Sequence, residues 1–522
     1  MTRPRRLTIV TSLVVAVLAA LFATIPRFDS TAAESPGAGN TAPTAAVSTG
    51  TAQTATLRTL AAARGMRFGT AVAAGALSNE QDYRDKVRYE FNSITPESAM
   101  GWSRTEPQRG VYQWQDADTV IDFAAGAGQD VRGQTSVWYN SVPDWVAHGN
   151  FGADELRAIL KAHIEAVVSR YKDRVHIWDV VNEVLNDDGT MRSSFWSDRL
   201  GTGYIADALR WARAADPTAK LYINDYNAER VNSKSTALFD LATNLRRQGV
   251  PLDGIGFQTH VTVNTDVSQL KGLLGKFADA GFDVAITELD VRMTLPPTQA
   301  QVDAQTAAYD SIVRSCIAVT RCVSTTVWGF TDAHSWVPSS LPGWGAATMF
   351  DTNLAPKAAY TAVNAALADR DFTTTAVAAH SGKCLDVPHS EKTLDIQLQQ
   401  YTCNGTSAQS FAFRRVSPGI YTIVNTGNGR CVTVAGASTA PGAAVIQSTC
   451  GSGPEQRFEL RRVTGFGSAA SFQLRPTHSY KCVDVAQVSM NNQAPLIQYT
   501  CNADPTVAAN QVWQLAGIPG HL

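Results

Sequence analysis

An excess of charge of either sign is absent from this chain of 522 residues. Its 44 Lys and Arg side chains balance 46 Asp and Glu side chains, and the formal net charge is -2. Proteins that bind DNA or RNA usually carry a basic face. We therefore expect no nucleic-acid partner.

Two kinds of cofactor motif are also missing. No Gly-rich phosphate-binding loop follows the first predicted strand, and no close cluster of Cys and His has the spacing of a metal site. We therefore expect no cofactor and no metal ion. The missing loop also argues against an open doubly wound α/β sheet, which is the alternative to the fold predicted below.

A long apolar run occurs at the N-terminus. Three arginines within the first six residues precede an uncharged run over residues 7–25, and small residues follow at 31–33. This pattern predicts a signal peptide over residues 1–33. An uncleaved membrane anchor is the alternative, and the adjacent arginine pair leaves a twin-arginine export signal open.

The next segment, residues 34–55, is mostly Ala, Thr, Gly, Ser and Pro. These residues are too small and polar to form a packed core, so we predict a disordered, low-complexity linker. After cleavage of the signal peptide the protein would be secreted and extracellular, without a membrane anchor. We expect it to be a monomer.

The eight cysteines are even in number, which fits an oxidising compartment. Three pairs share the same separation of 19 positions, and a fourth pair is closer together. We expect disulfides in place of a metal site, which would need tighter clusters. The pairs are Cys384 and Cys403, Cys431 and Cys450, Cys482 and Cys501, and Cys316 and Cys322.

Residues 56–368 alternate short apolar strands with stretches whose apolar residues recur at helical spacing, as in ADELRAILKAHIEAVVSRY. Eight such units predict an α/β fold, a (β/α)8 TIM barrel. In such a barrel the chemistry lies at the C-terminal ends of the strands. The expected strands cover residues 66–72, 91–95, 130–138, 175–181, 220–226, 254–260, 283–289 and 325–331.

Residues 374–519 have few helical periods and many Gly, Thr, Gln and Ser residues. One unit occurs three times, each copy with Cys-apolar-x-Val near its start, a second Cys, and Gln-x-aromatic near its end. A single unit of about 47 to 51 residues cannot bury its own apolar side. The repeats therefore predict a closed, three-fold, all-β domain at the C-terminus.

Two glutamates lie at predicted strand ends. Glu183 follows the fourth strand and Glu288 lies near the end of the seventh, while Gln258 and His260 end the sixth and Trp328 lies in the eighth. Facing carboxyl groups suit glycoside hydrolysis, because one protonates the leaving oxygen while the other attacks or activates water. Their proximity would raise the pKa of one carboxyl group and so supply the acid. A structural role for either glutamate is the alternative.

The stretches WDVVNE, INDYN, GFQTH, ITELD, TVWGFTD and SWV occur in this order between about residues 57 and 368. Together they closely resemble glycoside hydrolase family 10, the retaining xylanases. The resemblance implies that Glu183 is the general acid/base and Glu288 the nucleophile. The two carboxyl groups would then lie about 5–5.5 Å apart.

The resemblance also implies roles for neighbouring residues. Asn182 would hydrogen-bond the sugar 2-hydroxyl group, and His260 would bond the nucleophile and be oriented by Asp290. Tryptophans would form the walls of the cleavage subsite, and two residues after strand five would lie on the leaving-group side. The substrate-binding residues implied in this way are Glu97, Trp138, Asn182, Tyr226, Asn227, Gln258, His260, Trp328 and Trp336. Cys316 and Cys322 fit the family as a bridge before the eighth strand.

The glycone side departs from the family pattern. These positions normally bond the sugar units on the non-reducing side of the cut, and losing one such bond costs about 1–3 kcal/mol of recognition. Replacing Lys by Gly and Gln by Ser would free volume for a hexose hydroxymethyl group. The departures are Ser98 for Asn, Gly101 for Lys, Gln134 and Tyr139 for His, and Ser141 for Gln.

The three-fold unit resembles the ricin-type β-trefoil, a sugar-binding module. Its pocket uses an Asp after the first Cys, an aromatic residue before the second Cys, and a polar residue after it. Repeat two has lost all three and repeats one and three keep them. The implied pocket residues are Asp386, Tyr401 and Asn404 in repeat one, and Asp484, Tyr499 and Asn502 in repeat three. A stable spacer without binding is the alternative.

The sequence thus predicts a secreted, retaining endo-1,4-β-xylanase with a carbohydrate-binding module, and a polysaccharide as its partner. Two alternatives remain open. One is a retaining β-glycosidase of altered glycone specificity, which would act on hexose-containing chains such as plant saponin sugars, as a tomatinase does. The other is a catalytically silent carbohydrate-binding protein.

Overall fold

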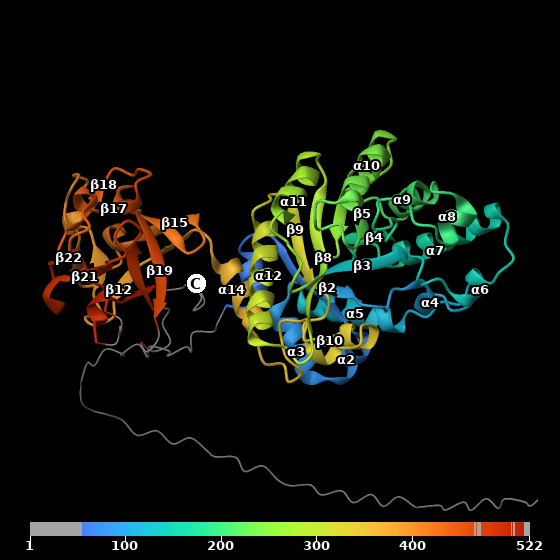
Figure 1. The fold of residues 1–522 in the computed structure, drawn as a ribbon, viewed down its shortest axis with the longest axis horizontal. Coiled ribbons are helices and arrows are strands. Elements are labelled where there is room, and N and C mark those ends of the chain that lie inside the picture. Colours follow the sequence, from blue (N-terminus) through green and yellow to red (C-terminus); the bar gives the residue numbers. More distant parts are fainter. Residues whose placement is uncertain (1–54, 464–465, 467–470, 503, 505–506, 516–522) are drawn as a thin grey trace, which may run out of the picture. The chain divides into compact units, whose positions relative to one another are not determined.

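A computed structural model describes residues 55–463, 466, 471–502, 504 and 507–515. The predicted signal peptide (1–33) lies outside the described residues, and so does the predicted linker (34–55) except for Ala55. Among the described residues, an α/β part is followed in the chain by an all-β part (Figure 1).

Eight parallel strands of the described chain close into a barrel. The hydrogen-bonded order is β9-β1-β2-β3-β4-β5-β6-β8, and the pairing of β8 with β9 completes the ring. This confirms the predicted (β/α)8 TIM barrel. The strands are β1 (Arg67–Val72), β2 (Ser93–Pro96), β3 (Asp130–Val137), β4 (Ile177–Asn182), β5 (Lys220–Asp225), β6 (Gly254–Phe257), β8 (Asp283–Thr294) and β9 (Cys322–Val327).

Strand β8 is longer than predicted. Beyond the barrel its residues 290–292 pair with β7 (His260–Thr262), and residues 293–294 pair with β10 (Trp344–Gly345). The sequence had indicated that Glu288 lies near the end of its strand. Because β8 is longer, Glu288 lies within the strand instead. It sits at a shift of register in the pairing of β8 with β9, between Ile286 and Leu289.

Two other strand ends also differ from the prediction. Strand β6 ends at Phe257, because Thr259 takes a left-handed backbone conformation with φ 65°. Gln258 therefore follows β6 and His260 begins β7. Strand β9 starts and ends earlier than expected, so Trp328 is the first residue after the strand and not part of it.

The helices cover the outside of the barrel (Figure 1). Several begin with a capping box, in which a side chain accepts from the third helical N–H group while that residue's side chain bonds back. Asn232 with Ser235 and Thr298 with Gln301 are examples. The helices are α1 (Leu57–Ala62), α2 (Ala74–Asn79), α3 (Gln81–Glu90), α4 (Trp102–Thr105), α5 (Gln115–Ala127), α6 (Asp144–Ala147), α7 (Ala153–Arg170), α8 (Phe195–Leu200), α9 (Tyr204–Ala215), α10 (Ser233–Arg247), α11 (Leu270–Asp279), α12 (Gln299–Ile317), α13 (Val337–Ser340) and α14 (Ala358–Ala368).

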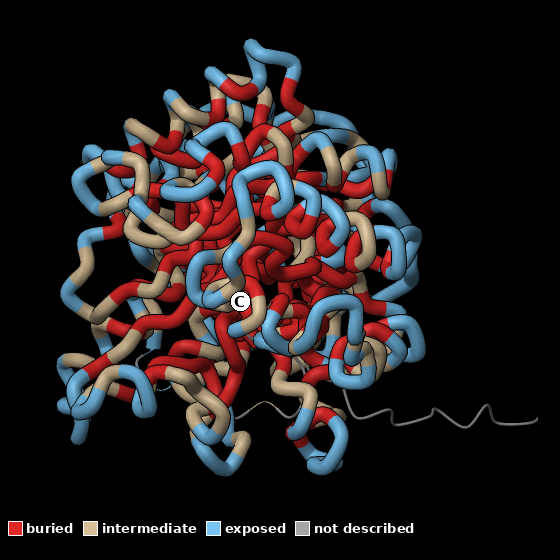
Figure 2. The backbone as a smooth tube through the Cα atoms, turned by 90° about the vertical axis from the view of Figure 1, so that its right-hand side faces the viewer, coloured by how far each residue is buried: buried red, intermediate tan, exposed pale blue. Residues whose placement is uncertain are grey.

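The barrel core is apolar except for a layer of polar groups. Figure 2 shows buried backbone gathered centrally and exposed backbone at the periphery. Trp178 and Phe257 are fully buried. Within this core the Arg132 guanidinium forms a two-point ion pair with Asp179, with Nε to Oδ2 at 2.6 Å, and lies over the Tyr222 ring. Since both charges are paired, their burial is tolerated.

The all-β part is built from antiparallel strands in a connected sheet, which confirms the predicted three-fold all-β domain. Each repeat contains a two-strand ladder: β13 with β14, β17 with β18, and β21 with β22. The strands are β11 (Phe372–Thr374), β12 (Ala376–Ala378), β13 (Cys384–Asp386), β14 (Gln399–Tyr401), β15 (Phe411–Ser417), β16 (Ile420–Asn425), β17 (Cys431–Val434), β18 (Val445–Ser448), β19 (Arg457–Val463), β20 (Ser471–Pro476), β21 (Cys482–Val485), β22 (Ala494–Tyr499) and β23 (Trp513–Leu515).

The disulfides of the structure join the cysteines in the predicted pairs. One bridge in each repeat ties the start of the ladder to the loop after it, and one bridge links the end of α12 to the start of β9. The bonded pairs are Cys384–Cys403, Cys431–Cys450, Cys482–Cys501 and Cys316–Cys322. In the part of the chain that the structure describes, no helix combines the length and the apolar character needed to span a bilayer.

Candidate active site

A continuous set of hydrogen bonds connects the two glutamates across the C-terminal end of the barrel. Glu183 Oε1 accepts from Asn182 Nδ2 at 3.3 Å and from Gln258 Nε2 at 3.2 Å. Asn224 Nδ2 donates to Asn182 Oδ1 at 3.0 Å and to Glu288 Oε1 at 2.7 Å. All five side chains are buried. Strands far apart in the sequence therefore bring both carboxyl groups into one polar cluster.

The second carboxylate oxygen of Glu288 belongs to a chain of aligned groups. His260 Nε2 lies 3.1 Å from Glu288 Oε2, and His260 Nδ1 lies 2.7 Å from Asp290 Oδ2. Trp336 Nε1 donates to the same Asp290 oxygen at 2.8 Å. Asp290 thus holds both the imidazole and the indole, and the imidazole in turn orients Glu288. The resemblance implied the contacts of His260 with Glu288 and Asp290, whereas the contact of Trp336 with Asp290 was not expected.

The ionisation of these groups follows from their burial and charge. Burial would lower the pKa of His260, but the adjacent Asp290 and Glu288 outweigh it and raise that pKa to about 10. Burial raises the pKa of Glu288, although the hydrogen bond and charge of His260 oppose the increase. The charge of Glu183 adds a small further increase. The protonated neighbour His260 therefore favours the ionised form of Glu288, against the effect of burial.

Asn224 is a functional side chain that the sequence reasoning missed. It is fully buried at the end of β5, and its Oδ1 accepts from Thr287 Oγ1 at 2.6 Å. From the INDYN stretch, the sequence analysis selected Tyr226 and Asn227, which follow the strand. Asn224, within the strand, makes the contacts with Asn182 and Glu288. The alternation of side chains along a strand gave the available signal.

The three predicted tryptophans come from different parts of the barrel rim. Trp138 follows β3, and its backbone oxygen accepts from the Trp196 indole at 3.3 Å. The rings of Trp328 and Trp336 lie 6.3 and 5.0 Å from the His260 ring, both in edge-to-face orientation. Trp328 and Trp336 therefore flank the nucleophile's histidine, which is consistent with the walls expected for a cleavage subsite.

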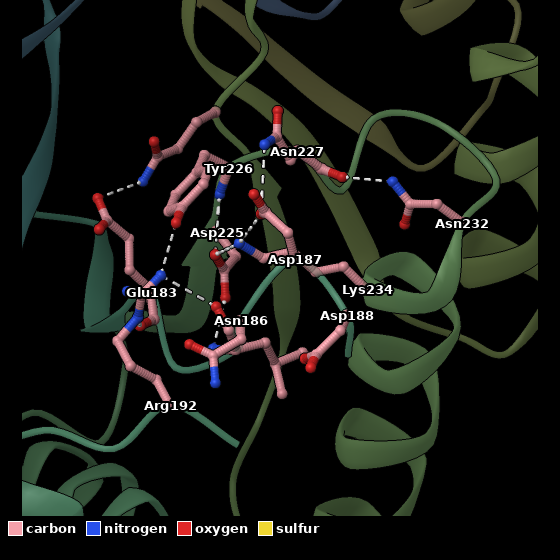
Figure 3. Close-up of polar contacts among 12 residues, drawn as sticks. Glu183, Asn186, Asp187, Asp188, Arg192, Asp225, Tyr226, Asn227, Asn232 and Lys234 are labelled. Carbon is pink, nitrogen blue, oxygen red and sulfur yellow. Dashed lines mark hydrogen bonds and ion pairs between the residues drawn. The ribbon is translucent and has the colours of Figure 1, made fainter. Parts of the chain in front are cut away.

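Tyr226 and Asn227 belong to a second polar cluster beside Glu183 (Figure 3). Asn227 Nδ2 donates to Asp187 Oδ1 at 3.2 Å. The Lys234 ammonium is fully buried, 2.9 Å from Asp225 Oδ1 and 3.4 Å from the centre of the Tyr226 ring. Burial raises the pKa of Asp225 to about 6, although Lys234 opposes the shift. This cluster fixes the loops that follow β4 and β5.

The trefoil repeats share one structural device, which explains the Gln-x-aromatic signature. In repeat one, Gln409 Oε1 accepts from the Asn404 backbone N–H at 2.8 Å, and its Nε2 donates to Thr402 O at 3.0 Å. In repeat three, Gln511 makes the matching bonds with Asn502 N and Thr500 O. These glutamines therefore close the loop around the second cysteine of each repeat.

The Asp of each predicted pocket, in repeats one and three, accepts a hydrogen bond from the glutamine of its own repeat. Gln409 Nε2 donates to Asp386 Oδ2 at 3.0 Å, and Gln399 Nε2 donates to Asp386 Oδ1 at 2.7 Å. In repeat three, Gln511 and Asn510 both donate to Asp484 Oδ2, each at 2.9 Å. Among the described residues, none donates a hydrogen bond to Asp484 Oδ1. Within the described part of repeat three, one carboxylate oxygen of Asp484 therefore lacks a hydrogen-bond donor, while both oxygens of Asp386 are engaged.

The polar residues after the second cysteines lie differently from the prediction. The Asn404 and Asn502 side-chain oxygens accept from the backbone N–H groups of residues 406 and 504, each at 3.0 Å, and so cap the next turn. Asn510, which the sequence reasoning missed, is the asparagine that touches Asp484. Repeat one has Ala408 at the matching position before its glutamine.

The aromatic residues lie on the same face of each ladder as the acids. Asp386 pairs with Gln399, two residues before Tyr401, and Asp484 pairs with Ile497, two residues before Tyr499. The Tyr499 side chain is half exposed. In repeat two, Thr433 and Ser448 take these positions and bond to each other at 2.5 Å. The hydroxyl pair therefore replaces the acid and the aromatic ring in that repeat.

Comparison with known protein families matches residues 56–366 to the model of glycosyl hydrolase family 10. The chain belongs to this family. The C-terminal residues 368–447 and 408–499 match the model described as a ricin-type beta-trefoil lectin domain-like family. The family 10 domain is therefore followed by a ricin-type trefoil, as the two resemblances had implied.

Curated relatives match this chain over most of their own length. An endo-1,4-beta-xylanase of Agaricus bisporus is 48% identical over 271 residues, which are 52% of this chain and 81% of the relative. Endo-1,4-beta-xylanase A of Phanerodontia chrysosporium is 45% identical over 310 residues, 59% of this chain and 76% of the relative.

Solved structures of xylanases are also similar to this chain. Native xylanase 10B of Thermotoga maritima is 38% identical with a TM-score of 0.59, and the match covers 60% of this chain and 98% of that one. Xylanase 10B of Thermotoga petrophila, solved in complex with xylobiose, is 38% identical with a TM-score of 0.60 over 61% and 98% of the chains.

The glycone side of the family 10 domain is packed more closely than the sequence suggested. A Cβ atom added at Gly101 would lie only 2.8 Å from Ser141 Oγ. The Ser141 hydroxyl also lies 3.3 Å from that of Ser103. Part of the volume that the small residues were expected to free is therefore filled by Ser141 itself. Ser98 is exposed and Gln134 is buried.

Glu97 and Tyr139 interact electrostatically with Glu288 and Glu183, respectively. Burial raises the pKa of Glu97, with the charge of His334 opposing and that of Glu288 adding to the shift. Burial, followed by the charge of Glu183, raises the pKa of Tyr139 to about 12. A neutral phenol thus stands near Glu183, at a position where the sequence comparison expected a histidine.

Proposed function

We propose that the protein is a retaining endo-1,4-β-xylanase. The observation that carries the proposal is the single hydrogen-bonded cluster that holds Glu183 and Glu288, with His260 and Asp290 behind Glu288. The xylanase names of the relatives support the substrate class. The carboxyl separation of 5–5.5 Å that retention requires stays a prediction.

The mechanism follows from the assigned roles. Glu288 Oε attacks the anomeric carbon while Glu183 gives its proton to the glycosidic oxygen, which leaves with the bonding electron pair. Glu183, now ionised, takes a proton from water. The water oxygen then bonds to the anomeric carbon and releases Glu288 as a carboxylate.

The neighbouring side chains support these steps. Asn182 holds Glu183 Oε1 through its Nδ2 group. It would also hydrogen-bond the sugar 2-hydroxyl group. His260, held protonated by Asp290, stabilises Glu288 whenever it carries a negative charge. Tyr226 and Asn227 line the leaving-group side.

A substitution at the nucleophile tests the proposal directly. Glu288→Ala should reduce turnover of xylan and of aryl xylobiosides by several orders of magnitude, since covalent catalysis is removed. Half-buried Glu165→Ala on α7 is the control and should behave as the parent, because Glu165 pairs with Lys161 on the helix surface. Equal turnover by the parent and Glu288→Ala would favour the catalytically silent, carbohydrate-binding alternative.

A second candidate is a retaining β-glycosidase that acts on hexose-containing chains. The observation in its favour is the altered glycone side, where Gly101 and Ser141 replace two long polar side chains. The kcat/KM values for aryl xylobioside and aryl cellobioside separate the two candidates. A strong preference for the xyloside removes the second one, and a preference for the cellobioside or for saponin sugars removes the first.

We further propose that the trefoil binds carbohydrate through repeats one and three. Asp386 and Asp484 would accept sugar hydroxyl groups while Tyr401 and Tyr499 lie against the sugar ring. We also propose that the two domains cover residues 56–368 and 374–519. The protein would be secreted after removal of residues 1–33, and it would be a monomer that is not attached to the membrane. The four disulfides support an extracellular location.

A further inference from the structure

Glu183 has an unusual backbone. Its φ is 58°, in the left-handed region that residues other than glycine seldom occupy. Such a conformation persists only where surrounding contacts impose it, and it is common at functional sites. The contacts that impose it therefore also decide where the Glu183 carboxyl group points.

Two hydrogen bonds hold this backbone from opposite sides. The Glu183 N–H group donates to Asn224 O at 2.8 Å. The Glu183 carbonyl oxygen accepts from Arg192 Nε at 2.9 Å, and Arg192 Nη2 also donates to Leu185 O at 3.1 Å. One guanidinium thus bonds two carbonyl groups, of Glu183 and Leu185, in the loop that leaves β4. The Leu185 N–H group donates to Asp225 Oδ2 at 3.2 Å, which holds the same loop from the β5 side.

Arg192 is itself fixed in place. Its Nη2 donates to the Tyr226 hydroxyl at 2.6 Å, and its guanidinium carbon lies 4.7 Å from the centre of the Tyr139 ring and 5.6 Å from that of Tyr226. Its backbone N–H group donates to Val184 O at 2.8 Å. Figure 3 shows Arg192 beneath Glu183 with Tyr226 beside it. A planar fork of donors suits this geometry in a way that a lysine ammonium does not.

We propose that Arg192 is a positioning residue for the acid/base, which holds the Glu183 backbone so that the carboxyl group meets the glycosidic oxygen. The inference rests on the proposed retaining mechanism. Small displacements of a catalytic group cost on the order of 10²-fold in rate, so loss of the fork should impair proton transfer specifically.

A leaving-group series separates this role from a general structural one. Arg192→Met is assayed on aryl xylobiosides whose leaving groups range from phenol to dinitrophenol. With phenol, which needs a proton, kcat/KM should fall about 10²-fold. With dinitrophenol, which leaves unaided, kcat/KM should stay within about threefold, because Glu288 attack needs no acid. With dinitrophenol, kcat and KM should fall by the same factor. The reason is that hydrolysis of the glycosyl-enzyme still needs Glu183 as the base.

Three further variants complete the test. Arg192→Lys should recover part of the lost phenol activity. Tyr226→Phe, which removes one anchor of Arg192, should show a weaker loss of the same kind. Exposed Arg199→Met on α8 is the matched control and should equal the parent. Should Arg192→Met fail to fold, Arg192→Lys carries the comparison, with its loss confined to poor leaving groups.

An equal loss for all leaving groups would overturn the inference, and so would no loss at all. Failure of the proposed function looks different. Glu183→Gln should show the steepest leaving-group dependence of all. If that variant shows none while the parent is active, Glu183 is not the acid and the proposed mechanism itself falls.

Discussion

The hydrogen bonds of Asn224 connect the side chains of the candidate site. Its amide nitrogen reaches Asn182 and Glu288, and its oxygen is taken by Thr287. The residue is buried, so each of these bonds replaces bonds to water. Asn224 therefore sets the orientation of Glu288 Oε1 while His260 sets that of Oε2.

Asn224→Ala should lower kcat/KM by about 10- to 100-fold, because a hydrogen bond to a charged group contributes roughly 1.5–3 kcal/mol. The measurement is steady-state hydrolysis of an aryl xylobioside, with thermal unfolding to verify the fold. Exposed Asn244→Ala on α10 is the control. Activity within twofold of the parent would show that His260 alone is enough to orient Glu288.

At the scale of single elements, the repeats of the trefoil are unequal. In repeat three, no described residue donates to Asp484 Oδ1, and Asn510 donates to Oδ2. Repeat one engages both Asp386 oxygens and has Ala408 at the position of Asn510. Repeat two has only a Thr433–Ser448 hydroxyl pair. The geometry therefore favours the pocket of repeat three for accepting a sugar hydroxyl group.

The pocket of repeat three should respond to pH. Burial raises the pKa of Asp484 to about 6, with the hydrogen bonds from Gln511 and Asn510 opposing the shift. The carboxylate that accepts sugar hydroxyls exists above this value, so binding should weaken as the pH falls through about 6. The measurement is adsorption to insoluble xylan between about pH 5 and 8.

Asp484→Asn should lower adsorption at high pH and remove most of this pH dependence, whereas Asp386→Asn should leave the dependence in place. Adsorption by the parent that does not change over this pH range would contradict the assignment of Asp484 as the titrating ligand.

At the scale of the whole molecule, one chain carries a hydrolase barrel and a trefoil with its own core. The barrel site uses residues between β2 and β10, and the trefoil pockets use residues 384–511. No residue is shared by the two sets among the described residues. Chemistry and attachment to a polysaccharide should therefore be separable by mutation.

The double variant Asp386→Ala/Asp484→Ala should hydrolyse a soluble aryl xylobioside within about twofold of the parent. On insoluble xylan its rate should fall about tenfold or more at low substrate loading, because attachment raises the local concentration of chain ends and bonds near the barrel. Both rates and the adsorbed fraction are measured. Full retention of adsorption by the double variant would support the spacer alternative.

Much of this organisation was predictable from local patterns. The alternation of strands and helices indicated the barrel, and the equal cysteine spacing indicated the bridges. Glu183 and Glu288 were predicted as the acidic pair because the short motifs around them are local features of the chain. The end of β8 was predicted wrongly, because its extension depends on pairing with β7 and β10, which strand periodicity does not encode.

By itself the sequence determined the elements, the family and the acidic residues, because these follow from periodicity and short motifs. Only the tertiary structure decided which side chains meet. Asn224 contacts residues 42 and 64 positions away, Arg192 reaches back to the Glu183 carbonyl, and Asn510 lies 26 positions from Asp484. Barrel closure and strand register create these contacts, and hydrogen-bond geometry at such separations is a property of the packed molecule.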